Sequence, residues 1–145
     1  MATGDLIFFE ESKALMLSGG WEAADDIKVA ICDNTATPTA AQATPALGDF
    51  TEVGAAGSYV TGGTSIGTWT SLIVEAAGTV TFDSATNPTW AQNASNDTDA
   101  WWAIGYNDTD AGNAALFFVE LGGPVNMATG ALTITWNASG IATLV

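Results

Sequence analysis

Short apolar runs of strand length, separated by Gly, Asn, Asp and Pro, recur along this chain from residue 27 onward and constrain its fold most. In the first run, β-branched residues at every second position alternate with Lys28, Ala30 and Cys32, as in a half-buried strand. The other predicted strands are Tyr59–Thr61, Trp69–Val74, Thr79–Asp83, Trp101–Asn107, Ala114–Leu121, Leu132–Trp136 and Ile141–Leu144. About seven to eight short strands predict a mainly β fold, an antiparallel β-sandwich or jelly roll.

The segments between and before these runs complete the predicted organisation. Residues 5–18 read as a short helix, with Gly19 and Gly20 as its stop. Residues 34–58 are rich in Thr, Ala, Pro and Gly and predict a long loop. Residues 137–140 predict a tight hairpin between the last two strands. We therefore expect an N-terminal arm with a short helix at 1–20 and a single β-sandwich domain at 21–145.

The charged and nucleophilic inventory is small for a chain of 145 residues, which has no histidine, no arginine, two lysines and one cysteine. Most general acid–base and anion-clamping mechanisms use the residues that are missing. We therefore predict that the protein is not an enzyme and needs no cofactor. A net charge of −14 is repelled by phosphate backbones and anionic lipids, so neither nucleic acid nor membrane is an expected partner.

Cys32 lies inside an apolar run and has no second cysteine to pair with, so we expect a small buried hydrophobe. The N-terminal stretch has no basic region, and Glu10, Glu11 and Lys13 interrupt its apolar residues. This pattern argues against a signal peptide. No run approaches the roughly 18 apolar residues that a membrane span requires. The sequence thus favours a protein made and kept in a cytoplasm, or released by lysis.

The densest acidic segment offers one candidate metal site. Asp108, Asp110 and Gly112 have the spacing of half a calcium loop, in which oxygen ligands and a turn-forming glycine surround one cation. The glutamate expected further on is missing, since Val119 occupies its position. A hairpin turn rich in turn formers explains the same residues equally well. Asp108 and Asp110 are therefore weak metal candidates.

Two further patterns point to other classes of function. Trp21, Trp69, Trp90 and Trp101 could form a carbohydrate-stacking platform, or they could fill a core or a subunit interface, where tryptophan is enriched. Sixteen acids also guarantee some close carboxylate pairs, as glycoside hydrolysis requires, but none has a recognisable catalytic setting. A carbohydrate- or calcium-binding β-sandwich module remains an alternative function, and a hydrolase that uses only carboxylates ranks last among the alternatives.

The sequence resembles small virion proteins of tailed bacteriophages, which have a short N-terminal helix followed by a strand of the type "IKVAICD". The resemblance continues through "YVTGGT", "WWAIGYNDTDAG", "FFVELGG" and "LTITWNASGIATL" and covers most of the chain from Ile7 to Leu144. These segments are strand and turn signatures rather than chemical motifs. The family therefore brings no catalytic residues with it.

The resemblance implies a capsid decoration or cement protein on the outer shell, which binds the major capsid protein and copies of itself, as a homotrimer. It also implies assembly in the host cytoplasm and a place on the virion surface. A tail-, neck- or fibre-associated virion protein is the alternative within the particle. Under the decoration hypothesis residues 1–20 contact the shell or a neighbouring subunit, because a solvent-facing arm would not carry so many apolar side chains. The predicted interface residues are Leu6, Ile7, Phe8, Phe9 and Trp21.

Overall fold

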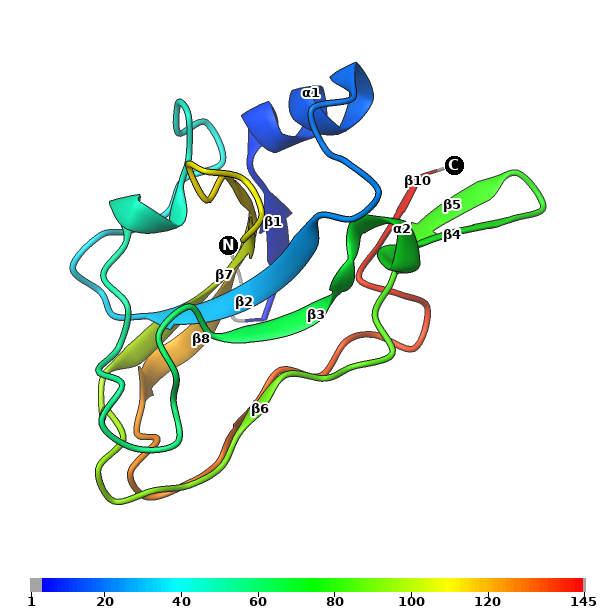
Figure 1. Ribbon diagram of the computed structural model, residues 1–145. Helices are drawn as coiled ribbons and strands as arrows, with labels where there is room; N and C mark the ends of the chain where they lie inside the picture. The colour runs from blue at the N-terminus through cyan, green and yellow to red at the C-terminus, as the bar shows by residue number, and fades with distance from the viewer. Residues whose placement is uncertain (1–3, 145) are drawn as a thin grey trace.

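The computed structural model describes residues 4–144 and shows a mainly β protein built from antiparallel sheets (Figure 1). The central sheet has five strands in the order β1-β8-β7-β2-β3. Its strands are β1 (Leu6–Phe8), β2 (Asp26–Cys32), β3 (Thr64–Thr68), β7 (Ala100–Asn107) and β8 (Ala115–Val125).

Two smaller sheets accompany the central one. A three-stranded sheet has the order β10-β5-β4, and a two-stranded ribbon pairs β6 with β9. Their strands are β4 (Ile73–Ala76), β5 (Thr79–Phe82), β6 (Thr89–Trp90), β9 (Leu132–Thr133) and β10 (Ala142–Leu144). The helical elements are α1 (Glu10–Ser18), α2 (Trp69–Leu72) and the short 3-10 helix η1 (Leu47–Asp49). In Figure 1, β4 and β5 form a hairpin that projects from the rest of the molecule.

The core covers both faces of the central sheet, which explains why its strands carry so many apolar residues. Along β2, Val29 and Ile31 pack into one apolar cluster, and Ala30 and Cys32 pack into the other. The predicted burial of Cys32 is confirmed, since its side chain is fully buried. The same division separates Phe117 from Phe118 on β8. Alternation along these strands thus distributes side chains between two buried faces.

The prediction of one helix over residues 5–18 is half wrong. Residues 6–8 form strand β1, which pairs with β8 in the register Leu6↔Val119 to Phe8↔Phe117. The free edge of β8 offers these residues a ladder of main-chain hydrogen bonds, and the helix begins only at Glu10. Gly19 ends it in the left-handed conformation at φ 75°, as predicted. Residues 1–3 of the predicted arm lie outside the described residues.

The prediction of a strand over Trp69–Val74 is wrong at its first four residues, which form the helical turn α2. Its start is held by main-chain bonds from Trp69 N to the Asp25 carbonyl and from Thr70 N to the Ala23 carbonyl. The indole of Trp69 packs on Trp21 at a ring-centroid distance of 5.1 Å. These contacts with a distant segment override the local strand propensity.

Other boundaries shift as well. Tyr59–Thr61 forms no strand, whereas β3 and β6 are strands that the pattern missed. The predicted strand Leu132–Trp136 shrinks to β9, and residues 137–140 turn without forming a hairpin, because β9 pairs with β6 and β10 pairs with β5. The predicted loop at 34–58 is confirmed in outline, with η1 and isolated bridges at Glu52 and Ala46 as its regular structure.

Candidate functional site

The acidic turn after β7 is organised by contacts within the chain. Asp108 Oδ2 lies 2.6 Å from Lys28 Nζ on β2, and its other oxygen accepts a hydrogen bond from the Tyr106 hydroxyl at 3.0 Å. The hydrogen bond from Lys28 holds the pKa of Asp108 below its ordinary value. Asp110 Oδ2 instead accepts bonds from the main-chain nitrogens of Gly112 and Ala114. The two candidate metal ligands therefore have separate local roles: Asp108 forms an ion pair, and Asp110 stabilises the turn.

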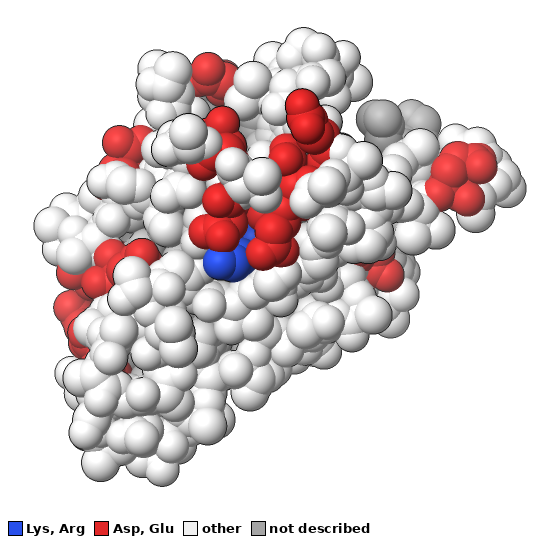
Figure 2. Space-filling view, viewed as in Figure 1, with Lys and Arg blue, Asp and Glu red and all other residues white. Residues whose placement is uncertain are grey.

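Within residues 4–144, no group of three or more His, Cys, Asp or Glu side chains is placed to hold a metal ion. Figure 2 shows carboxylates gathered around a lysine on the face over β2. Lys28 and Asp108 provide the ion pair of this face, and Asp26 accepts a hydrogen bond from Ser65 Oγ beside it. The arrangement supplies charge and hydrogen bonds to the surface of the sheet.

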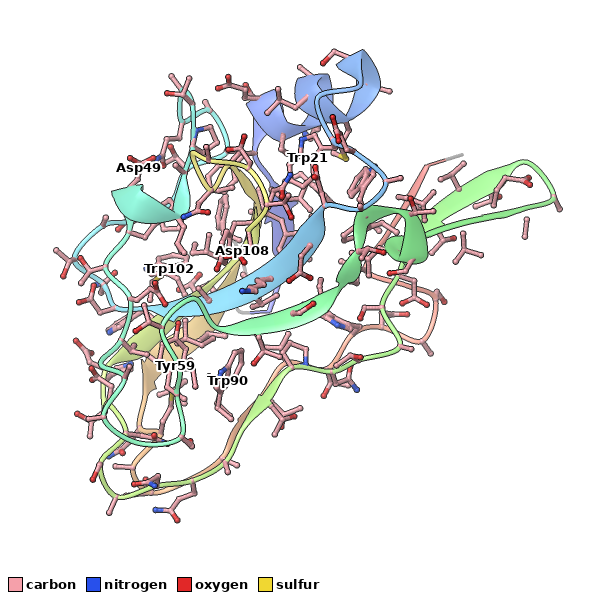
Figure 3. The ribbon with its side chains drawn as sticks, in the orientation of Figure 1. Trp21, Asp49, Tyr59, Trp90, Trp102 and Asp108 are labelled. Carbon is pink, nitrogen blue, oxygen red and sulfur yellow. The ribbon has the colours of Figure 1, made fainter. Side chains whose placement is uncertain are left out.

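A buried tyrosine network fastens the segment after the long loop onto β2. Beyond Val29, strand β3 no longer pairs with β2, so the main-chain groups of Ile31 need other partners. The Tyr59 hydroxyl accepts a bond from Ile31 N at 3.1 Å and donates one to Glu52 Oε2 at 2.6 Å. Burial and the bond to Glu52 raise the pKa of Tyr59 far above its usual range, so the phenol stays protonated. Figure 3 shows Tyr59 beside Trp90, with a ring-centroid distance of 6.1 Å.

The backbone also approaches β2 closely at the end of this segment. Gly63 adopts φ +70°, and a Cβ atom there would lie 1.9 Å from the Val29 carbonyl oxygen. The Tyr106 hydroxyl donates to the Gly62 carbonyl at 2.8 Å. The "YVTGGT" segment, whose role the sequence did not reveal, therefore holds the end of β3 against the central sheet.

An apolar groove of about 450 Å³ lies between α1 and the three-stranded sheet. One wall comes from α1, and the other comes from β4, β5 and β10. Trp69 also lines the groove and packs on Phe82 at a ring-centroid distance of 5.6 Å, with the rings tilted by 39°. The residues that line this groove, hereafter the apolar groove, are Phe8, Lys13, Met16, Leu17, Trp69, Ile73, Val80, Phe82, Ala142 and Thr143.

Exposed apolar side chains cluster around the apolar groove. Leu17, on its α1 wall, is 84% exposed, and Val74 on β4 is 50% exposed. Ile73, which also lines the groove, is exposed as well. Val60 is the remaining large exposed hydrophobic residue, and it lies in the segment held by Tyr59. Leu17 and Ile73 thus belong to the surface of the apolar groove, and Val74 follows Ile73 on β4 without lining the groove.

The predicted interface residues lie mostly inside the subunit. Phe9 is fully buried and contacts Phe118 at a ring-centroid distance of 5.0 Å. Trp21, labelled in Figure 3, is buried and packs on Trp69. Leu6, Ile7 and Phe8 are half-buried in strand β1. The structure thus brings only Phe8 of the five to the apolar groove. Leu17, which the sequence reasoning did not single out, is the most exposed large hydrophobic residue of its lining.

The four tryptophans of the predicted stacking platform do not share one surface. Trp21 and Trp90 are buried, and the ring of Trp69 is tilted 48° from that of Trp21. The indole nitrogen of Trp101 donates to Asp99 at 2.7 Å. This arrangement agrees with the alternative reading of core packing for Trp21 and Trp90.

Comparison with protein-family models, with curated proteins and with solved structures found no match. Among the described residues, no helix has the length and apolar character needed to cross a membrane. The site is therefore interpreted from its own geometry, in which the apolar groove and the adjoining strand β4 are the most distinctive features.

Proposed function

We propose that this chain is a structural virion protein of a tailed phage, which binds the outer capsid shell and stabilises it through contacts between subunits. The observation that carries the proposal is the apolar groove, with its exposed lining residues Leu17 and Ile73. Contiguous exposed apolar surface is typical of a site that a partner covers. The resemblance to virion proteins in the strand and turn segments supports the same function.

The proposed partners are the major capsid protein and further copies of the chain, arranged as a homotrimer on the capsid surface after assembly in the host cytoplasm. Weak contacts repeated at many symmetric positions add up to firm attachment, so each copy needs only a modest interface.

We further propose that the three sheets form a variant of the antiparallel sandwich or jelly roll. The burial of both faces of the central sheet supports this packing.

The charge distribution suits a place outside the shell. Figure 2 shows carboxylates gathered on the face over β2, and Lys13 is the charged residue that lines the apolar groove. A net charge of −14 on an outer coat opposes contact with packaged DNA and keeps particles apart in suspension. The lining of the apolar groove thus contains one charged residue, and Glu75 lies on the adjoining strand β4.

The test is the number of copies per purified particle, measured by quantitative mass spectrometry against the major capsid protein. A shell component is expected in numbers comparable to those of capsid subunits. A few copies up to some dozens would favour a tail-, neck- or fibre-associated protein, to which the same apolar surface could equally attach. Absence of the chain from mature particles would refute both.

Deletion of residues 1–20 is a poor test of attachment, because it removes β1 from the central sheet and Phe9 from the core. A sharper test is Leu17→Glu, which alters an exposed side chain, with Val60→Glu as the matched control elsewhere on the surface. Occupancy of the particle should fall for the first variant and stay unchanged for the second. Equal occupancy for both would refute the role of the apolar groove in attachment.

A further inference from the structure

We propose that the apolar groove receives the β4–β5 hairpin (residues 73–82) of a second copy of this chain. This inference rests on the proposed function, because it assigns the surface through which the assembled copies hold one another. The occupant is identified by three observations: a strand edge that no described strand pairs, a matching pattern of apolar and acidic side chains, and a groove lysine with no carboxylate partner among residues 4–144.

The first observation is the exposed edge of β4. This strand is the last in the order β10-β5-β4 and pairs on one side only, from Ile73↔Phe82 to Ala76↔Thr79. All four of its residues are exposed, and it contains neither proline nor a bulge. Such an edge presents free main-chain groups and is a template for another chain unless something covers it. Figure 1 shows the hairpin projecting away from the central sheet, where a neighbour can reach it.

The second observation is the side-chain pattern on the hairpin. Successive residues of a strand point to opposite faces, so Val74 and Glu75 lie on opposite sides of β4. A hairpin that enters a groove contacts both walls, and these two side chains would meet different ones. Positive φ at Ala77 and Gly78, together with the bond from Gly78 N to Glu75 Oε1 at 3.0 Å, fixes the turn that presents them. The hairpin is therefore a preformed ligand.

The third observation concerns Lys13, which lines the α1 wall of the apolar groove. Of the two lysines, Lys28 forms an ion pair with Asp108, whereas Lys13 has no carboxylate partner among residues 4–144. A carboxylate on an otherwise apolar segment complements a groove with this lining. On this chain, Ile73, Val74 and Glu75 have that composition.

The contact joins the free edge and tip of the hairpin of one copy to the groove of the next copy, and so is heterologous. Each hairpin also lines the groove of its own subunit through Ile73, Val80 and Phe82. Heterologous contacts close into rings when the rotation between copies allows it, which agrees with the proposed homotrimer. A groove of about 450 Å³ is within the range that accommodates several side chains. The net charge of −14 opposes association, so the interaction should strengthen as salt rises toward physiological levels.

The experiment measures self-association of the purified full chain by sedimentation and light scattering over a range of concentration and salt. Val74→Glu should weaken association about tenfold or more, because it places a second charge against an apolar wall. Val60→Glu is the matched control and should leave association unchanged. Overlapping circular dichroism spectra and melting curves establish that each variant is folded.

A charge-swap cycle tests the predicted pairing. Lys13→Glu and Glu75→Lys should each weaken association, and the double variant should recover most of the loss. The cycle also cancels the contribution of the turn bond to Gly78, since both variants with Lys at position 75 lack it. Additive losses in the double variant would overturn the pairing of Lys13 with Glu75.

A chain that stays monomeric at every concentration and salt, or an oligomer that Val74→Glu leaves intact, would overturn the inference. Neither result bears on whether the protein is present in particles. Conversely, absence from particles would refute the proposed function while leaving the association measurement unaffected. The two failures are therefore distinguishable.

Discussion

Replacing Tyr59 by phenylalanine removes one buried oxygen atom and tests how β2 is satisfied beyond the end of β3. The hydroxyl accepts from Ile31 N at 3.1 Å and donates to Glu52 Oε2 at 2.6 Å, while Val53 N donates to the Ile31 carbonyl. The Tyr59 hydroxyl and the Val53 amide thus take the place of the main-chain groups that a longer strand β3 would offer to Ile31. In the variant, the Ile31 amide is buried without an acceptor.

The magnitude follows from the two bonds. An unsatisfied buried amide costs about 1–3 kcal/mol, and a hydrogen bond to a carboxylate contributes about 1.5–3 kcal/mol. Because the phenylalanine ring keeps the packing against Trp90, we expect a total loss of about 3 kcal/mol in the free energy of unfolding. For a chain of this size the loss lowers Tm by about 9 °C.

The assay is urea denaturation followed by tryptophan fluorescence, with Tyr106→Phe as the matched control. The Tyr106 hydroxyl accepts no bond, and its one hydrogen is shared between the Gly62 carbonyl and the Asp108 carboxylate, so its removal leaves no buried amide unpaired. We expect a loss of about 1.5 kcal/mol for that variant, the low end for a bond to a carboxylate, because the Asp108 side chain is partly exposed. If Tyr59→Phe cost no more than Tyr106→Phe, the argument that Tyr59 completes the edge of β2 would be refuted.

Three other variants or treatments test separate features. Gly63→Ala should destabilise the fold by about 3 kcal/mol or more in urea titration, because of its positive φ and the contact with Val29, whereas Gly130→Ala, which meets nothing within 4 Å, should change it by less than about 0.5 kcal/mol. The lowered pKa of Asp108 stabilises the folded state above the pKa that the carboxyl has in the unfolded chain, and this stabilisation is lost as pH falls through the folded pKa. The difference in free energy of unfolding between the wild type and Lys28→Met should therefore shrink below about pH 4. A constant difference down to about pH 2 would contradict this. Burial raises the pKa of the Cys32 thiol, so a thiol reagent should modify it in denaturant but not in the native state, as mass spectrometry would show.

The strands that the sequence predicted well are those whose pattern is decided by the core. β2, β5, β7 and β8 appear close to their predicted positions, since apolar side chains along them have buried faces to fill. Residues 6–8 were expected in a helix, because their apolar spacing fits either structure. The deciding factor is the edge of β8, which the local sequence does not encode.

The candidate site was harder to predict, because its parts come from segments far apart in the chain. The apolar groove combines residues of β1, α1, α2, β4, β5 and β10, and no single motif spans them. The sequence suggested that apolar residues near the N-terminus form an interface, but Phe9 and Trp21 are used inside the subunit. The acidic turn was prominent in the sequence, and its carboxylates are engaged by Lys28 and by main-chain amides.

The failed strand prediction at Trp69–Val74 and the exposed surface have the same physical origin. Trp69 turns inward to pack on Trp21 and Phe82, and this turn ends the local run before β4 begins. Ile73 and Val74 are then left on a hairpin that projects beyond the core, although their propensity for strand structure is high. A chain under selection only for its own stability gains little from two exposed β-branched residues on an open edge, since such an edge invites association. Their exposure is accounted for if another subunit covers them, which is the condition that the association measurements on Val74→Glu test.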